Sequence, residues 1–253
     1  MSGHSKWSTI KHKKAAVDAK KGKIFSRLSK ELTLAARAGG GDITANPRLR
    51  SAISAARDAN MPNDNVQRAI KKGLGELGGA VLEEMVYEGF CGGGVAVLVD
   101  ILSDNRNRTA AEIRSIFNKA NNTMASSGSV ARLFSRKARF VIVGEQADED
   151  KLIEICLNAG VDVDDIWADD GQAEITAPPE AFDGIVKALE EANIQVSEST
   201  VVKLADTMMP VTDVNIARQI NNFVEALEEQ DDVQGVSTNA EFTDEVMAKL
   251  AAE

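Results

Sequence analysis

Residues 139–203 carry an ordered series of segments that few folds accommodate. The apolar spacing predicts six elements in the order strand, helix, strand, strand, helix, strand: 139–143, 148–158, 163–167, 172–176, 179–192 and 195–203. This β-α-β-β-α-β order is the split arrangement of ferredoxin-like folds. We therefore expect residues 135–204 to form one ferredoxin-like α/β domain.

The segments on either side predict a second α/β domain that the first one interrupts. Before it, we expect two strands, a helix that starts at a Thr109/Glu112 capping box, and a third strand: 85–90, 95–102, 109–120 and 129–134. One helix leaves one face of that sheet bare. A helix at 213–229 and a strand at 233–239 can complete it, so the predicted domain is discontinuous, comprising 79–134 and 205–253.

Residues 1–78 predict a small all-helical domain. A stripe of Phe25, Leu28, Leu32 and Ala35 marks a helix from 24 to 38, with Gly39 placed as its C′ residue. Two further helices are expected to follow, opened by Asn46-Pro47 and capped by Asn63, before a glycine-rich linker. The predicted class is α+β, an all-helical N-terminal domain followed by two α/β (ferredoxin-like) domains.

Charge is divided unevenly between these parts. The chain has 29 Lys and Arg against 39 Asp and Glu, but residues 1–78 hold 16 of the basic and 6 of the acidic residues. The first part therefore has a net charge of +10 (16 − 6) and the remainder −20 (13 − 33). A basic end on an acidic body indicates a polyanionic partner, of which nucleic acid is the commonest in a cytosol. No segment pairs a bulky apolar face with the basic one, so a membrane partner is not expected.

The N-terminal arm concentrates this charge. Seven lysines fall within eighteen residues, with Asp18 as the only acid: Lys6, Lys11, Lys13, Lys14, Lys20, Lys21 and Lys23. Lysines that neutralise phosphates release counterions, which favours contact with nucleic acid, although a solvated tail kept for solubility is the alternative. Trp7 either stacks on a base or packs the arm against the helices.

The sequence at 104–109, Asp-Asn-Arg-Asn-Arg-Thr, stands before the predicted capped helix. A helix N-terminus carries partial positive charge, so Arg106 and Arg108 require a compensating anion. A phosphate is one candidate and Asp104 is the other.

Other chemistry has little support in the sequence. The two cysteines, Cys91 and Cys156, match no metal or redox spacing and are expected to be buried thiols. Only two histidines are present, and no catalytic set, nucleotide-binding loop or calcium loop stands out. We therefore expect no enzyme activity, no cofactor, no metal and no small-molecule substrate. With neither a secretory signal nor an apolar run of membrane-spanning length, a cytoplasmic location is expected.

Several motifs resemble the YebC/PmpR family of bacterial regulators. They are Gly3-His4-Ser5-Lys6-Trp7, 10–14, 21–25, Asn60-Met61-Pro62, 68–73, Tyr87-Glu88-Gly89-Phe90, 103–109 and 128–130. Together they span nearly the whole chain. Two stretches depart from the family pattern, Cys91-Gly92 where a proline is frequent and 121–125 where a glycine-rich turn is usual.

The resemblance implies a cytoplasmic, three-domain α/β protein that binds DNA and regulates transcription. Related proteins, including mitochondrial ones, look like translation factors, so ribosomal RNA is the alternative partner. The chain lacks a helix-turn-helix signature, which argues against strongly sequence-specific binding. The residues expected to contact nucleic acid are Lys6, Trp7, Lys11, Lys13, Lys14, Lys20, Lys21, Lys23, Arg27, Lys71, Lys72, Arg106 and Arg108.

Overall fold

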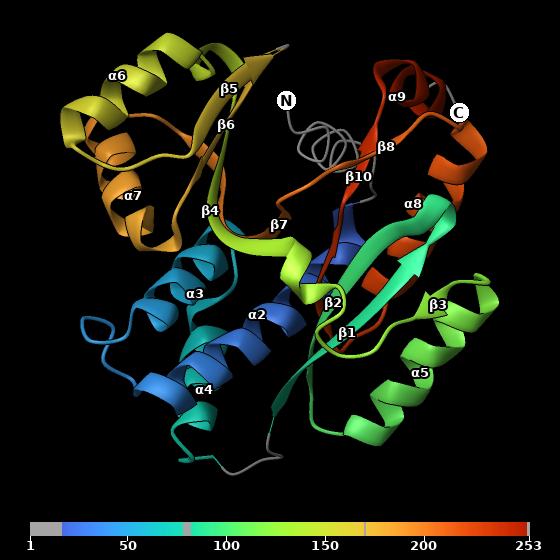
Figure 1. Cartoon of the computed structure of the whole chain (residues 1–253). Coiled ribbons are helices and arrows are strands. Elements are labelled where there is room, and N and C mark those ends of the chain that lie inside the picture. Colours follow the sequence, from blue (N-terminus) through green and yellow to red (C-terminus); the bar gives the residue numbers. More distant parts are fainter. Residues whose placement is uncertain (1–16, 78–81, 170, 252–253) are drawn as a thin grey trace. The chain divides into compact units, whose positions relative to one another are not determined.

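The computed structural model describes residues 17–77, 82–169 and 171–251, which form helices and antiparallel sheets (Figure 1). The predicted α+β class is confirmed. One compact unit spans Phe134–Asp206, and the second contains the described residues before and after it. The finer division into three domains at 78/79, 134/135 and 204/205 stays a prediction.

Three helices form the N-terminal part: α2 (Val17–Gly39), α3 (Pro47–Asp58) and α4 (Asn63–Gly73). The expected stripes meet in one core, where Leu32, Leu49 and Ile70 are buried and Phe25 packs at the edge. The helices α2 and α4 approach so closely at Gly73 that a Cβ on this residue would overlap the Thr33 carbonyl oxygen. Only glycine fits at this position, and the approach fixes the spacing between the two helices.

The helix ends differ from prediction in three places, the first being α2, which begins at Val17 and not at residue 24. Asn46 caps α3 as expected, since its Oδ1 accepts the Leu49 N–H at 3.0 Å. Gly39 is the last residue of α2, and Gly40 takes the left-handed conformation with φ +80°. Asn63 is the first residue of α4 and caps nothing; Pro62 occupies the cap position and no side chain bonds there.

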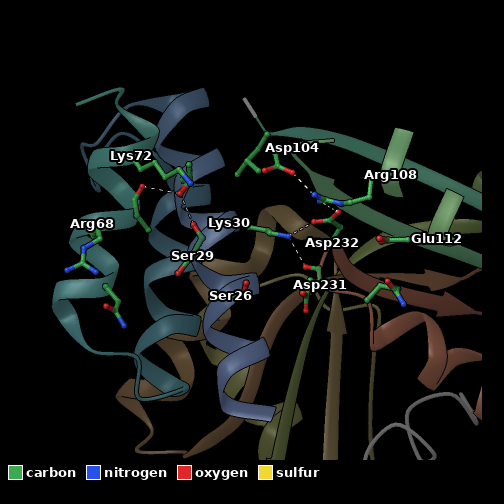
Figure 2. A pocket seen from close by; sticks show the side chains of 15 residues that line it. Ser26, Ser29, Lys30, Arg68, Lys72, Asp104, Arg108, Glu112, Asp231 and Asp232 are labelled. Atoms are coloured by element: carbon green, nitrogen blue, oxygen red, sulfur yellow. Dashed lines mark hydrogen bonds and ion pairs between the residues drawn. The ribbon is translucent and has the colours of Figure 1, made fainter. Parts of the chain in front are cut away.

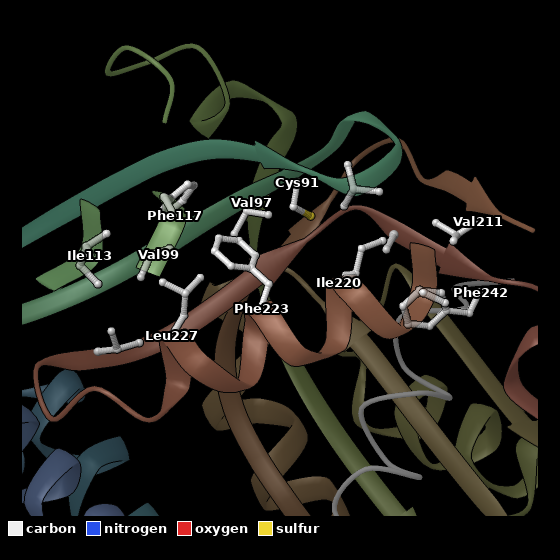
Figure 3. Packing of buried hydrophobic residues seen from close by; sticks show 14 of the residues in the cluster. Cys91, Val97, Val99, Ile113, Phe117, Val211, Ile220, Phe223, Leu227 and Phe242 are labelled. Atoms are coloured by element: carbon white, nitrogen blue, oxygen red, sulfur yellow. The ribbon is translucent and has the colours of Figure 1, made fainter. Parts of the chain in front are cut away.

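The second part of this unit is an antiparallel sheet in the order β3-β1-β2-β9. Its strands are β1 (Glu83–Cys91), β2 (Val95–Ser103), β3 (Thr123–Met124) and β9 (Val233–Thr238). Helices α5 (Arg106–Lys119) and α8 (Val214–Glu228) pack on it. Phe117 of α5 meets Phe223 of α8 edge to face, with ring centroids 4.8 Å apart (Figure 3). The expectation that the C-terminal segment supplies a helix and a strand to this sheet is confirmed by the pairing of β9 with β2.

The predicted strand at 129–134 is wrong. Residues Ala131–Leu133 form a 3₁₀ turn, and the short strand β3 takes the place beside β1. The buried Glu88 carboxylate is the cause, because it accepts the N–H groups of Gly128 and Val130 at 2.6 Å and of Ala131 at 2.9 Å. Donors held by a carboxylate cannot join a ladder.

The same unit ends in a small parallel pair of strands and a helix that the sequence pattern did not indicate. Strands β8 (Met209–Val211) and β10 (Ala240–Phe242) pair, and α9 (Asp244–Ala251) follows. Val211, Phe242 and Val246 extend the core beyond the sheet.

The unit 134–206 has the predicted β-α-β-β-α-β order. It comprises β4 (Phe134–Val143), α6 (Glu149–Ala159), β5 (Asp165–Asp169), β6 (Gln172–Ala177), α7 (Phe182–Glu191) and β7 (Val196–Ala205). The strands lie in the order β5-β6-β4-β7 and all pairs are antiparallel, as in ferredoxin-like folds. Phe140, Ile142 and Ile185 are fully buried in its core.

A candidate nucleic-acid interface beside a polar groove

The structure places only part of the predicted basic set. Lys6, Trp7, Lys11, Lys13 and Lys14 lie outside the described residues. The backbone of Lys20 and Lys21 is part of α2, but their side chains are not among the described parts of the structure. The remaining six residues are described: Lys23 and Arg27 lie on α2, Arg106 and Arg108 at the start of α5, and Lys71 and Lys72 on α4.

The basic face of α2 is turned to the C-terminus of α8. Lys23 Nζ donates to the Glu229 carbonyl at 2.8 Å, Arg27 donates to the Glu228 carbonyl, and Lys30 Nζ donates to the Asp231 carbonyl at 2.8 Å. The last carbonyls of a helix lack partners within it and carry partial negative charge. Lys23 and Arg27 thus hold α2 against α8, a role that sequence reasoning missed because these side chains also suit phosphate.

Asp232 collects the largest set of donors in this region. Its side chain is 7% exposed and forms an ion pair with Lys30 at 2.7 Å and with Arg108 at 2.8 Å. The Ser103 and Thr109 hydroxyls donate to the same carboxylate at 2.8 Å and 2.7 Å. Burial by itself raises the pKa of Asp232, but the bonds from Lys30, Arg108, Thr109 and Ser103 outweigh it and hold the pKa well below its usual range.

The start of α5 corrects the predicted capping box. The helix begins at Arg106, and Asn105 is its N-cap, accepting the Arg108 N–H at 3.1 Å. Thr109 lies inside the first turn and is buried against Asp232. An asparagine three positions before the second arginine was the signal available in the sequence, because Asn is as good an N-cap as Ser or Thr.

The two arginines of that turn have different environments. Arg108 lies 3.1 Å from Asp104 and 2.8 Å from Asp232, and the hydrogen bond that it donates to Asp232 leads the effects that raise its pKa. The alternative in which Asp104 supplies the compensating anion therefore holds for Arg108, with Asp232 as a second anion. Arg106 is exposed and has no hydrogen bond or ion pair to the described residues.

Helix α4 carries three further cations. Arg68, Lys71 and Lys72 are exposed, and none of them bonds to another side chain or carbonyl in the described part of the chain. Arg68 and Lys72 are four residues apart and share one side of the helix. These side chains remain free to meet an anion.

A pocket of about 820 Å³ lies between α2, α4 and the start of α5. Figure 2 shows Arg68 and Lys72 on α4, Ser26 and Ser29 on α2, and Glu112 on the far side. The paired Lys30, Arg108 and Asp232 form part of its lining (Figure 2). Both basic and acidic side chains therefore face this polar groove.

The described residues offer no support for other classes of site. They contain no cluster of three potential metal ligands, and none of their helices is long and apolar enough to cross a membrane. Cys91 and Cys156 are free and buried, as expected, and burial raises the pKa of Cys91 to about 12. A thiol with such a pKa is protonated and unreactive at neutral pH.

Comparison with known proteins gives the same family over both units. Residues 5–76 match the model described as the TACO1/YebC protein N-terminal domain, and residues 82–240 match the TACO1/YebC second and third domain.

Relatives match over their full lengths. A protein of Desulforapulum autotrophicum is 49% identical over 250 residues, covering 97% of this chain and 98% of its own. One from Desulfotalea psychrophila is 46% identical over 251 residues, covering 99% and 100%. Both are named "Probable transcriptional regulatory protein". The crystal structure of a conserved hypothetical protein from Aquifex aeolicus matches with a TM-score of 0.82 and 38% identity, covering 91% of this chain and 94% of that one.

Proposed function

The chain belongs to the TACO1/YebC family, and we propose that it is a non-enzymatic regulator of transcription that binds DNA through its basic N-terminal part. Relatives named as transcriptional regulatory proteins support the regulatory role. The DNA-contacting surface that we propose comprises the lysine-rich arm without Lys23, the free cations of α4 and Arg106.

One observation supports this assignment above the others, the contrast between paired and free cations. Lys23, Arg27 and Arg108 bond within the chain, whereas Arg68, Lys71, Lys72 and Arg106 have no such partner among the described residues. Exposed cations that no internal acid neutralises repel one another. In an otherwise acidic protein, that arrangement favours a polyanion as the partner.

The residue types of this surface determine how far it can distinguish one DNA sequence from another. Lysine and arginine side chains that contact phosphates fix the position of a protein on DNA but do not read its sequence. We therefore propose binding that depends mainly on charge, with modest preference among duplex sequences. Catalysis has no part in this proposal.

The test measures binding of the full chain to a fluorescent duplex by anisotropy. Lys13→Glu/Lys14→Glu should weaken binding by on the order of 100-fold or more at moderate salt, because two phosphate contacts are replaced by repulsion. The matched control, Lys187→Glu/Lys249→Glu, reverses two exposed cations of the acidic part and should have little effect. Equal losses in the two variants would reject the proposal.

The partner in the cell requires a separate measurement, because ribosomal RNA presents the same phosphates as DNA. We expect the protein to sediment with chromosomal DNA after crosslinking. Sedimentation with ribosomes instead would replace transcription by translation as the regulated process.

A further inference from the structure

The concave shape of the polar groove is not explained by contact with the phosphates of a duplex. Its floor is α2 and one wall is α4, and the start of α5 with residues 230–232 forms the opposite wall (Figure 2). A duplex presents its phosphates on a convex surface, which exposed cations can contact without a groove. A concave groove suits a ligand small enough to enter it.

Free hydrogen-bond donors gather on the α2 and α4 side of the groove. The side chains of Ser26, Ser29, Asn65, Arg68 and Lys72 line it, and none of them has a bonding partner in the described part of the chain. Two unpaired cations with hydroxyl and amide donors beside them match the oxygens of a phosphate. The other two cations of the lining, Lys30 and Arg108, are already paired with Asp232.

A free acceptor lies on the opposite wall. Glu112 is partly buried, and its carboxylate forms no ion pair with the described residues and accepts no hydrogen bond from them, whereas Asp104 is paired with Arg108. Carboxylates accept hydrogen bonds from exocyclic amino groups, as in recognition of the cytosine N4 amine. The groove thus has a side for phosphate and a side for a base that carries an amino group.

The volume agrees with a nucleotide ligand. A pocket of about 820 Å³ lies within the roughly 300–1,000 Å³ range of small-molecule sites. We propose that the groove binds one or two unpaired nucleotides, with a phosphate on Arg68 and Lys72 and an amino-bearing base on Glu112. The proposal rests on the proposed function only in that the ligand is nucleic acid, and it adds a site for single strands. None of the residues that line the groove is aromatic, so binding depends on charge rather than on stacking.

The experiment uses the full chain and 5′-phosphorylated dinucleotides, which match the one or two nucleotides that the groove is proposed to hold. Calorimetric titration at low salt with pCpC and its deoxy form separates RNA from DNA as the source of the ligand. Arg68→Ala/Lys72→Ala should weaken binding at least tenfold. The control Arg37→Ala/Arg57→Ala removes two exposed cations that do not line the groove, one on α2 and one on α3, and should change the affinity less than twofold.

Glu112→Ala tests the base side. The parent should bind pCpC at least fivefold more tightly than pUpU, because uracil lacks the amino group, and the variant should bind both alike. Circular dichroism that matches the parent establishes that each variant is folded.

The outcomes separate this proposal from the proposed function. Binding of duplex without binding of either dinucleotide would overturn the groove site and leave DNA binding intact. Dinucleotide binding that requires Arg68 and Lys72, without duplex binding, would support the groove site and overturn the proposed function. Equal effects of the groove pair and the control pair on dinucleotide binding would also overturn the groove site.

Discussion

The Asp232 side chain connects residues from several elements of the fold. Its carboxylate joins a cation from α2, another from α5 and two hydroxyls, and it is nearly inaccessible to solvent. Asp232→Asn should lower the free energy of unfolding by about 2–4 kcal/mol, because it leaves Lys30 and Arg108 without their anion and gives the buried hydroxyls of Ser103 and Thr109 a weaker acceptor. Asp231→Asn, at the exposed neighbouring position, should cost less than about 1 kcal/mol. Urea unfolding of the three proteins at pH 7 measures both values, and equal losses would contradict the role of Asp232.

The lowered pKa of Asp232 gives this contribution a pH dependence of known sign. A carboxyl with a lowered folded-state pKa binds its proton more readily in the unfolded state. Its stabilisation is complete above the unfolded pKa of roughly 3.9 and is lost as the pH falls towards the folded pKa. The difference in unfolding free energy between parent and Asp232→Asn should therefore be constant from pH 5 to 7 and shrink below about pH 4. A difference that grew on acidification would have the wrong sign.

Substitution of Arg106 and of Arg108 should affect stability and duplex binding differently, although both arginines occupy similar positions in the sequence. Arg108→Ala removes a partner of buried Asp232 and should lower the unfolding midpoint. Arg106→Ala removes an exposed, unpaired cation, so it should leave the midpoint unchanged and weaken duplex binding severalfold. Thermal melts and anisotropy on both single variants check this, and a stability loss at Arg106 would reveal an internal partner.

Sequence reasoning could anticipate only half of this arrangement. Asp104 is four residues from Arg108, so local spacing indicates that pair. Asp232 lies 124 residues away, and no local pattern distinguishes it from the neighbouring Asp231. A partner brought in by the fold leaves no trace in the sequence around the arginine.

At the scale of elements, the start of α5 shows two local signals in competition. Thr109 and Glu112 have capping-box spacing, yet Asn105 caps the helix one turn earlier and Thr109 turns to Asp232. The periodic interior of the helix was predicted correctly, since Ile113 and Phe117 are buried. The boundary depended on a tertiary contact that the sequence does not display.

This assignment predicts different costs at the two candidate cap residues. Asn105→Ala should destabilise the chain by about 1 kcal/mol, the usual value of an N-cap side chain. Glu112→Ala should cost less than about 0.5 kcal/mol, because its carboxylate bonds to no backbone group described here. Denaturant titrations measure both, and a larger loss at Glu112 would restore the capping box.

Element order was the most predictable feature of the whole molecule. The β-α-β-β-α-β series and the return of the C-terminal strand to β2 follow from apolar periodicity and the need to cover a sheet. The use of the basic residues was less predictable. Lys23 and Arg27 have the charge of a phosphate contact but bind the carbonyls at the end of α8. Composition alone cannot separate these two uses of a cation.

The last prediction concerns the salt dependence of the whole chain. If the arm and the free cations neutralise about five to eight phosphates of a duplex, the logarithm of affinity should fall against the logarithm of salt with a slope of about −4 to −7. Lys13→Ala/Lys14→Ala should flatten that slope by about 2, without changing the preference among duplex sequences, because phosphate contacts do not read bases. The unit 134–206 has its own core, so residues 135–204 made separately provide the control and should bind no duplex. An unchanged slope in the double variant would identify the arm as a solvated tail, and the free cations of α4 and Arg106 would then have to account for all of the affinity.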